Sequence, residues 1–265
     1  METEKRLDLL LVELGYFDSR TKAQNAISEG RVSADGKLIT KASAKVSDKT
    51  VLNVVAEKEY VGRGAYKLLA AIESFSPDIK GKTCLDVGAS TGGFTEVWLE
   101  HGANKVYAVD VGKDQLAPRL KSDPRVLSLE KTDVRVLAPE TVGDAELCSI
   151  DVSFISLTKI LSSPAVTELY GRGGKIIALV KPQFEAGKSA LDKHGVVKKA
   201  TDHVRVLDSM LIFASSLGYK VAGLIPSPIS GGDGNREYLM YLSDSIAAIS
   251  TAEIVKSAFS ATPKE

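Results

Sequence analysis

The sequence of 265 residues has no hydrophobic run long enough to cross a bilayer, and it lacks the pattern of a signal peptide. A membrane-spanning helix needs about 20 apolar residues, whereas the apolar runs here are short, as in residues 176–180. The N-terminal segment carries Glu2, Glu4 and Lys5 and has no apolar core that would direct secretion. These absences argue against a membrane role and predict a cytoplasmic protein.

Cysteine is also scarce, with only two residues in the chain. Cys84 and Cys148 each lie in an apolar, strand-like run. Disulfide scaffolds and zinc modules use several cysteines at characteristic spacings, which this sequence does not have. We therefore expect two buried free thiols, and we expect no metal site.

Net charge is absent as well, because 34 basic residues balance 34 acidic ones. This balance weakens the case for a nucleic-acid partner of the chain as a whole. Residues 20–49, however, hold seven basic and three acidic residues. That local excess could meet a phosphate backbone, or it could form an ordinary solvated surface.

A chain of this length, with 44% hydrophobic residues, can form one large and one small domain. We expect a small domain over residues 1–58, a linker over 59–63, a large domain over 64–245 and a C-terminal helix or tail over 246–265. The large domain alternates strand-like and helix-like segments, which predicts an α/β sheet with helices on both faces. The expected strands are residues 82–87, 105–110, 125–130, 146–151, 174–180, 219–225 and 236–242. Five parallel strands followed by an antiparallel hairpin are typical of class I (Rossmann-like) methyltransferases.

The small domain begins with a periodic helix pattern that Gly15 would end. Ser19 can cap a second helix over residues 20–29, and short strand-like pieces follow, with a turn signal at residues 34–37. This α+β pattern resembles an S4 RNA-binding domain, which implies recognition of structured RNA by a basic two-helix face. The candidate RNA-binding residues are Arg6, Arg20, Lys22, Arg31, Lys37 and, beyond this domain, Arg63. In the alternative interpretation, Arg6 and Asp8 form a pair on the helix surface and contact no RNA.

The most informative segment is residues 84–94, which read CLDVGASTGGF. An apolar run leads to Asp86, and a glycine-rich turn then enters a helix-like segment. Asp110 follows at the end of the next apolar run. Such an arrangement binds a nucleoside at the carboxyl edge of a parallel sheet, with the second acidic residue placed for a ribose.

Two kinds of nucleoside cofactor use turns of this type. In dehydrogenases the helix N-terminus faces a pyrophosphate, which the Asp86 carboxylate would repel. S-adenosyl-L-methionine carries an ammonium and a sulfonium but no phosphate, so the same carboxylate would attract it. Asp133, at the end of the third strand, could accept from an adenine amino group. The sequence favours S-adenosyl-L-methionine, with the candidate cofactor-binding residues Asp86, Gly88, Ala89, Ser90, Gly92, Gly93, Phe94, Asp110 and Asp133.

Four charged residues fall at strand or helix ends of the same domain. Lys67 opens the helix before the first strand, Asp151 ends the fourth, Lys181 follows the fifth and Glu237 opens the last. The loop after the fourth strand, SIDVSF in residues 149–154, lacks the Asn-Pro-Pro-Tyr-like motif of many amino-methyltransferases. The set instead resembles the Lys-Asp-Lys-Glu tetrad of the RrmJ/FtsJ class of RNA ribose 2′-O-methyltransferases.

A ribose hydroxyl is a weak nucleophile, so such an enzyme must orient it and help to remove its proton. The resemblance implies that Lys181 acts as the base or stabilises the forming alkoxide, and that Asp151 orients Lys181 and contacts the substrate. Lys67 and Glu237 would fix the ribose. Taken singly, these residues could also be a helix cap, a solvated lysine or a charge pair on an edge strand.

Almost the whole chain resembles the TlyA family, which is also labelled hemolysin A. The matching segments are GRGAYKL at 62–68, DVGASTGGF at 86–94, DVSFIS at 151–156, VKPQFE at 180–185 and GGDGNRE at 231–237. The resemblance implies S-adenosylmethionine-dependent 2′-O-methylation of cytidines, with ribosomal RNA or ribosomal subunits as the partner. A non-catalytic RNA-binding protein is the alternative. A membrane-active hemolysin would need an amphipathic or membrane-spanning segment, which we do not find.

Overall fold

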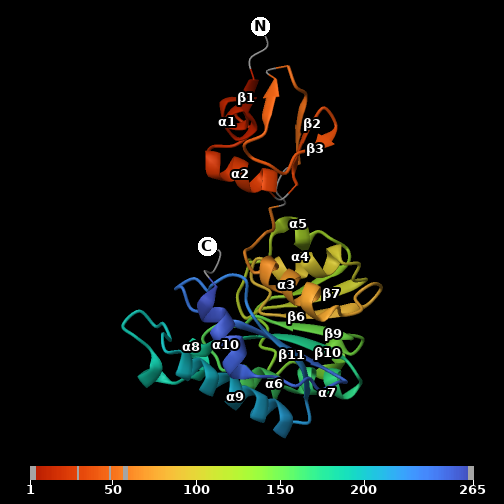
Figure 1. Ribbon diagram of the computed structural model, residues 1–265. Helices are drawn as coiled ribbons and strands as arrows, with labels where there is room; N and C mark the ends of the chain where they lie inside the picture. Colours follow the sequence, from red (N-terminus) through yellow and green to blue (C-terminus); the bar gives the residue numbers. More distant parts are fainter. Residues whose placement is uncertain (1–3, 29, 48, 56–58, 262–265) are drawn as a thin grey trace. The chain divides into compact units, whose positions relative to one another are not determined.

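The structure is a computed structural model that describes residues 4–28, 30–47, 49–55 and 59–261 (Figure 1). Its contacts divide the chain into two compact units, Met1–Glu59 and Tyr60–Glu265. The domain end that the sequence predicts at residue 58 lies outside the described residues, as do Glu29 and Asp48 of the basic segment.

The first unit combines two helices with short antiparallel strands. Its elements are β1 (Glu4–Arg6), α1 (Leu7–Glu13), α2 (Arg20–Ser28), β2 (Val32–Ala34), β3 (Lys37–Leu38), β4 (Lys45–Ser47) and β5 (Leu52–Val54). One sheet has the order β3-β2-β5, and β1 pairs with β4. The two expected helices and the tight turn are confirmed, with Asp35 and Gly36 at positive φ in the turn. The β1–β4 pair was not predicted, because strands of three residues are too short to show an alternating pattern.

Local signals set the ends of both helices in this unit. Gly15 has a φ of +77°, and the next residue, Tyr16, donates its backbone N–H to the Leu11 carbonyl over 3.0 Å. This left-handed ending closes α1 as glycine commonly does. The Ser19 hydroxyl accepts from the Lys22 backbone N–H over 3.3 Å, so Ser19 caps α2 as expected. The apolar sides of the helices then form a small core with β2.

The second unit is built on a seven-stranded sheet with the order β11-β12-β10-β9-β6-β7-β8. Its strands are β6 (Thr83–Val87), β7 (Lys105–Val109), β8 (Val126–Leu129), β9 (Leu147–Ile150), β10 (Lys175–Val180), β11 (Lys220–Pro226) and β12 (Tyr238–Ser243). The first five are parallel, and β12 inserts antiparallel between β10 and β11. The predicted strands and the late antiparallel hairpin are thereby confirmed.

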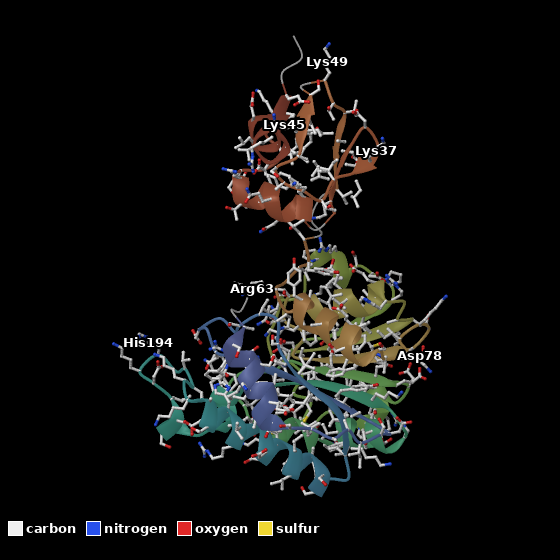
Figure 2. The ribbon with its side chains drawn as sticks, in the orientation of Figure 1. Lys37, Lys45, Lys49, Arg63, Asp78 and His194 are labelled. Atoms are coloured by element: carbon white, nitrogen blue, oxygen red, sulfur yellow. The ribbon has the colours of Figure 1, made fainter. Side chains whose placement is uncertain are left out.

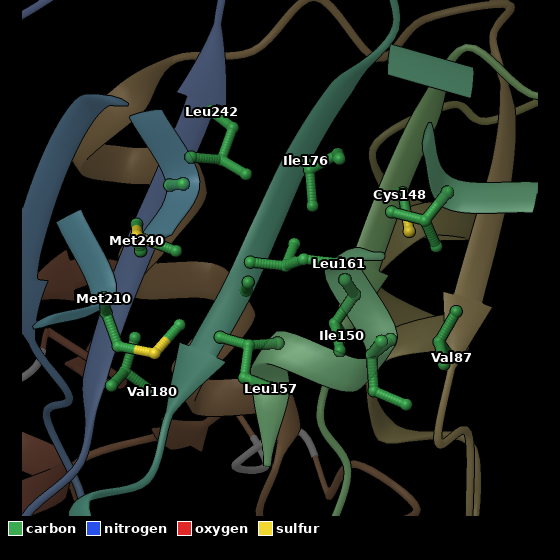
Figure 3. Close-up of a cluster of buried hydrophobic side chains, with 14 of the residues drawn as sticks. Val87, Cys148, Ile150, Leu157, Leu161, Ile176, Val180, Met210, Met240 and Leu242 are labelled. Carbon is green, nitrogen blue, oxygen red and sulfur yellow. The ribbon is translucent and has the colours of Figure 1, made fainter. Parts of the chain in front are cut away.

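Helices cover both faces of this sheet (Figure 1). They are α3 (Ala65–Phe75), α4 (Gly93–Glu100), α5 (Pro118–Lys121), α6 (Leu157–Leu161), α7 (Pro164–Gly171), α8 (Pro182–Glu185), α9 (Ala200–Ser216) and α10 (Thr251–Ser260), with 3-10 turns at Pro139–Val142 and Lys188–Ala190. Along β10, Ile176 and Val180 pack on the face with α6 and α9 (Figure 3), whereas Ile177 and Leu179 pack on the face with α3 and α4. A strand buried on both faces is apolar without interruption, as β10 is.

The two cysteines lie on opposite faces of this sheet. Cys148 belongs to the core beside α6 (Figure 3), and Cys84 belongs to the core beside α4. Both are buried and free, as expected, and burial raises the pKa of each thiol. Among the described residues, no helix combines the length and the apolar character needed to span a membrane.

Candidate functional site

Two adjoining cavities open at the carboxyl ends of the parallel strands. The first, which we call the lysine cavity, has a volume of about 600 Å³ and is lined by Lys67 and Lys181 among others. The second, the aspartate cavity, has a volume of about 630 Å³ and is lined by Asp110 and Asp133. The cavities share the wall residues Gly88, Ser90, Asp151, Ser153 and Phe154.

The four charged residues predicted from strand and helix ends come together in the lysine cavity. The Lys181 Nζ atom is 2.6 Å from Asp151 Oδ1, and the Lys67 Nζ atom is 2.7 Å from Glu237 Oε2. Lys67 Nζ also lies 3.6 Å from Asp151 Oδ2. The result is a continuous row of alternating charges. Lys67 and Lys181 are each 7% exposed and Glu237 is 3% exposed, so little water screens them.

Sheet topology explains why residues so distant in sequence meet. Asp151 follows β9 and Lys181 follows β10, so both leave the same edge of the sheet. Glu237 precedes β12, which is antiparallel, and its N-terminal end therefore lies at that same edge. Lys67 lies in the first turn of α3, the helix that packs beside α4 on one face of the sheet. Pro182 starts α8 directly after Lys181, so the strand ends at Lys181 and the cavity wall continues into this short helix.

Two residues of this site were not predicted, although they lie only two and three residues after Asp151 in the chain. The Ser153 hydroxyl accepts a hydrogen bond from Lys181 Nζ over 2.9 Å. Phe154 is 92% exposed, has a φ of +64°, and lies 5.4 Å from the Phe184 ring between centroids. A positive φ is unusual for a bulky residue and is typical of functional sites. The strand-end position of the segment was the available signal, but sequence pattern does not reveal a left-handed backbone.

The glycine-rich turn packs against the end of β9. Gly88 has a φ of +82°, and a Cβ atom there would overlap the backbone carbonyl of Asp151. Only glycine satisfies both constraints. The turn is also tied to β7, since Asp110 accepts from the backbone N–H of Ser90 over 2.8 Å and of Gly112 over 2.7 Å. Asp110 is therefore fixed at the wall of the aspartate cavity.

Asp86 has a different position from the one expected. It is fully buried, and it lines neither cavity. Its oxygens accept from the Thr95 hydroxyl over 2.7 Å and from the Ser149 hydroxyl over 2.9 Å. Burial raises the pKa of Asp86 to about 6. A direct contact between Asp86 and a cofactor ammonium does not agree with this geometry; the carboxylate lies beneath the turn and holds the start of α4.

The remaining predicted cofactor residues divide between the two cavities. Ala89, Gly93 and Phe94 line the lysine cavity, while Gly92, like Asp86, lines neither. Asp133 lines the aspartate cavity and is paired with Arg135, whose guanidinium lowers the pKa of the Asp133 carboxyl.

The aspartate cavity suits a cationic nucleoside better than a dinucleotide. Three carboxylates, those of Asp110, Asp133 and Asp151, line it together with two cationic side chains, Arg135 and Lys159. The carboxylates outnumber the cations, and they would oppose a pyrophosphate. Asp86 lies beneath the N-terminus of α4, where a pyrophosphate would otherwise bind, and it accepts from the Thr95 hydroxyl of that helix. The residues that line the aspartate cavity therefore fit S-adenosyl-L-methionine.

In the first unit, two of the predicted RNA-binding arginines converge on one buried carboxylate. Asp8 has no exposed surface, yet it accepts from Arg6 Nε and Nη2 over 3.0 Å and from Arg20 Nε over 2.9 Å. The Gln24 amide donates to it over 2.7 Å. The Arg6 guanidinium holds the pKa of Asp8 well below its usual range. The predicted Arg6–Asp8 pair therefore exists, and it also includes Arg20.

The other basic candidates are spread over both units. Lys22 is exposed on α2 and bonds Asp18 over 2.9 Å. Arg31 is half-buried just before β2, and Lys37 is exposed on β3 (Figure 2). Arg63 belongs to the second unit, where it is exposed and lines the lysine cavity (Figure 2). Among the residues that the structure describes, no cluster of side chains could hold a metal ion.

Comparison with protein families matches residues 60–244 to the FtsJ-like methyltransferase family and residues 5–52 to the S4 domain. The chain is 44% identical to the 16S/23S rRNA (cytidine-2′-O)-methyltransferase TlyA of Mycobacterium tuberculosis, over 91% of each chain. It is 38% identical to Hemolysin A of Brachyspira hyodysenteriae, over 89% of this chain and 98% of that protein. A solved structure from Streptococcus thermophilus, described as that of a hemolysin, superposes with a TM-score of 0.72 at 40% identity, covering 97% of this chain and 96% of its own.

Replacement of Gly88 by alanine tests the packing of the turn against β9. Gly88→Ala should lower the free energy of unfolding by roughly 2 to 4 kcal/mol, because it adds overlap with the Asp151 carbonyl to the cost of a positive φ. Gly81→Ala is the matched control, since Gly81 has a φ of +79° but open space around its Cβ position. It should cost only about 1 kcal/mol. Equal losses in denaturant titrations would show that the overlap is not important.

Asp86 predicts a specific pH dependence of stability. Burial raises its pKa from 3.8 to about 6, so its contribution to stability is fully present below pH 3.8 and is lost as pH rises through 6. Asp86→Asn cannot ionise. Its free energy of unfolding relative to the original protein should rise by roughly 3 kcal/mol between about pH 4 and pH 7. Trp98 fluorescence can follow unfolding, and a difference that stays constant with pH would contradict the assignment.

Proposed function

The chain belongs to the FtsJ-like methyltransferase family and to its TlyA group, and from this membership we propose that it methylates ribosomal RNA. The reaction is transfer of a methyl group from S-adenosyl-L-methionine to the 2′-hydroxyl of a cytidine ribose. The protein is thus an S-adenosylmethionine-dependent rRNA (cytidine-2′-O)-methyltransferase. The observation that carries this proposal is the row of alternating charges in the lysine cavity, directly beside a cavity that fits the methyl donor.

The donor would occupy the aspartate cavity. There Asp110 would accept from the ribose hydroxyls, and Asp133 from the adenine amino group. Gly88 and Ser90, in the wall that the two cavities share, would let the donor approach the backbone closely. When bound, the donor supplies an electrophilic methyl group on its sulfonium.

Lys181 is the residue that we assign to the reacting hydroxyl. Two acceptors, Asp151 Oδ1 and Ser153 Oγ, hold its Nζ atom, which leaves one position of the amine directed at a substrate. From there Lys181 would contact the 2′-oxygen, and it would either take the proton or stabilise the negative charge that develops. Asp151 and Ser153 orient Lys181, while Lys67 and Glu237 would fix the ribose.

The aromatic pair at the mouth of the cavities gives a place for the nucleobase. Phe154 lines both cavities with its ring almost fully exposed, and Phe184 lies beside it. Bases of single-stranded or flipped nucleotides stack on such side chains. A cytosine on Phe154 would bring its own ribose towards Lys181.

The first unit supplies RNA affinity in this proposal. Asp8 holds the Arg6 and Arg20 side chains, which stay 41% and 52% exposed, so both guanidiniums can reach phosphates. Ribosomal RNA or a ribosomal subunit is the expected partner, and a cytoplasmic location follows from that partner. An RNA-binding role without catalysis does not account for the lysine cavity. Burying charged side chains costs folding free energy, and RNA binding by the first unit does not require them. The membrane-active alternative has no corresponding site in the described part of the chain.

Lys181→Ala tests the catalytic assignment. Transfer of labelled methyl groups to ribosomal RNA or subunits should fall at least about 100-fold, as expected for loss of a group that handles the proton. Binding of S-adenosylhomocysteine, measured by calorimetry, should persist. Lys175→Ala is the control, because Lys175 lies at the opposite end of β10 and lines neither cavity. Full activity of Lys181→Ala, or no transfer by the unaltered protein, would refute the proposal.

Asp8→Asn tests whether the buried carboxylate positions the two arginines. Simple charge counting predicts tighter RNA binding after a negative charge is lost, whereas loss of positioning predicts binding weaker by about threefold to tenfold. Fluorescence anisotropy with an rRNA fragment at fixed salt separates the two. Asp18→Asn, which removes an exposed partner of Lys22, controls for charge. Arg20→Ala gives a second test should Asp8→Asn fold poorly, and unchanged RNA affinity of Arg20→Ala would contradict this assignment.

A further inference from the structure

An ion pair that the proposed mechanism does not use borders the aspartate cavity. Arg135 follows Asp133 by two residues, and its Nε atom is 3.0 Å from both Asp133 oxygens. Its Nη2 atom is 2.5 Å from Oδ2, and its backbone N–H donates to Oδ1 over 2.9 Å. Both residues line the cavity. Within the described residues, Arg135 supplies every hydrogen bond that the Asp133 carboxylate accepts.

These contacts engage both oxygens of the Asp133 carboxylate. Each carboxylate oxygen offers two lone pairs. Oδ1 receives the backbone N–H and Nε, and Oδ2 receives Nε and Nη2 of the same arginine. The one Nε–H is shared between the two oxygens, so the guanidinium lies across the whole carboxylate. An adenine amino group that approaches Asp133 must displace one of these bonds or share an oxygen with it.

The guanidinium can leave at little cost. The Arg135 side chain is 46% exposed and the Asp133 side chain 31% exposed. Water screens an ion pair at such exposure, so the pair changes an equilibrium constant by at most about fivefold. The Asp133–Arg135 pair is therefore weak enough for a ligand to displace, yet strong enough to lower that ligand's affinity measurably.

The chain contains a second pair of the same kind, away from the cavities. Arg125 contacts Asp123 through its backbone N–H over 2.9 Å, through Nε over 3.0 Å and through Nη2 over 2.7 Å. Neither residue lines the lysine or the aspartate cavity. Aspartate and arginine two residues apart thus close on each other without any help from a binding site. What distinguishes the Asp133–Arg135 pair is its position.

We propose that Arg135 competes with the adenine of the methyl donor for Asp133, and so holds the affinity for donor and product below the value that Asp133 alone would give. The inference rests on the proposed function, since it takes adenine as the group that enters the aspartate cavity. Arg135 acts through Asp133 and is a positioning residue. Re-formation of the pair assists release of the demethylated product, because product and donor carry the same adenine.

Calorimetric binding of S-adenosylhomocysteine to the full chain tests this competition. Arg135→Ala and Arg135→Gln should each bind about twofold to fivefold more tightly than the original protein. Arg125→Ala is the matched control and should show no change. In an Asp133→Asn background the additional Arg135→Ala substitution should give no gain in affinity, because the carboxylate for which adenine and Arg135 compete is already absent. The four variants together form a double-mutant cycle. The gain should also shrink between about 50 and 500 mM NaCl as screening increases.

Unchanged or weaker binding by both Arg135 variants would overturn the inference, as would a similar gain in Arg125→Ala or a gain that persists in Asp133→Asn. The proposed function fails separately. If the original protein binds the ligand and methylates RNA while the Arg135 variants behave identically, only the inference is wrong. If the original protein binds no S-adenosylhomocysteine, the function and the inference are both wrong.

Discussion

The site depends on the mutual neutralisation of four charges whose side chains are largely shielded from solvent. A buried charge costs several kcal/mol unless a partner compensates it. Here Lys181, Asp151, Lys67 and Glu237 alternate in sign, so every member has at least one opposite neighbour within 2.7 Å. Removal of Asp151 leaves Lys181 without its carboxylate, and removal of Lys67 leaves Glu237 without its ammonium. The four positions therefore work as one unit, although they come from separate parts of the chain.

Asp151 joins this unit to the donor side of the sheet. Its backbone N–H donates to the Val87 carbonyl over 2.9 Å, and its own carbonyl packs where a Cβ atom of Gly88 would lie. Its carboxylate lies between the two lysines. One residue thus fixes the glycine-rich turn, the wall between the cavities and the orientation of Lys181. Methyl transfer requires donor and acceptor in line at close range, and in the proposed function this shared wall lies between the two.

The sequence predicted the strands well, and it placed the four charged residues at strand and helix ends that meet in the structure. Their catalytic roles stay a prediction. Uninterrupted apolar runs identify buried parallel strands, and residues just past those runs must gather at one edge of the sheet. Ser153 and Phe154 lie in the same loop, but the interactions that define them depend on a left-handed backbone and on the final position of Lys181. The Asp133–Arg135 pair was missed for a related reason. The sequence shows two opposite charges two residues apart, but only the folded loop shows that their side chains contact each other.

Asp86 and Asp110 show how two residues of register separate a structural carboxylate from one that lines a cavity. Asp110 lies just past the end of β7, where it can line a cavity. Asp86 lies inside β6, one residue before its end, and shares a sheet face with Cys84. Side chains alternate along a strand, so Asp86 must point at α4. Ser149 of the neighbouring strand β9 faces the same way and bonds both Asp86 and Trp98 of α4. Polar residues at matching positions on adjacent strands therefore carried a signal in the sequence. They indicated an internal network that anchors the start of α4, and with it the glycine-rich turn that forms part of the wall between the two cavities.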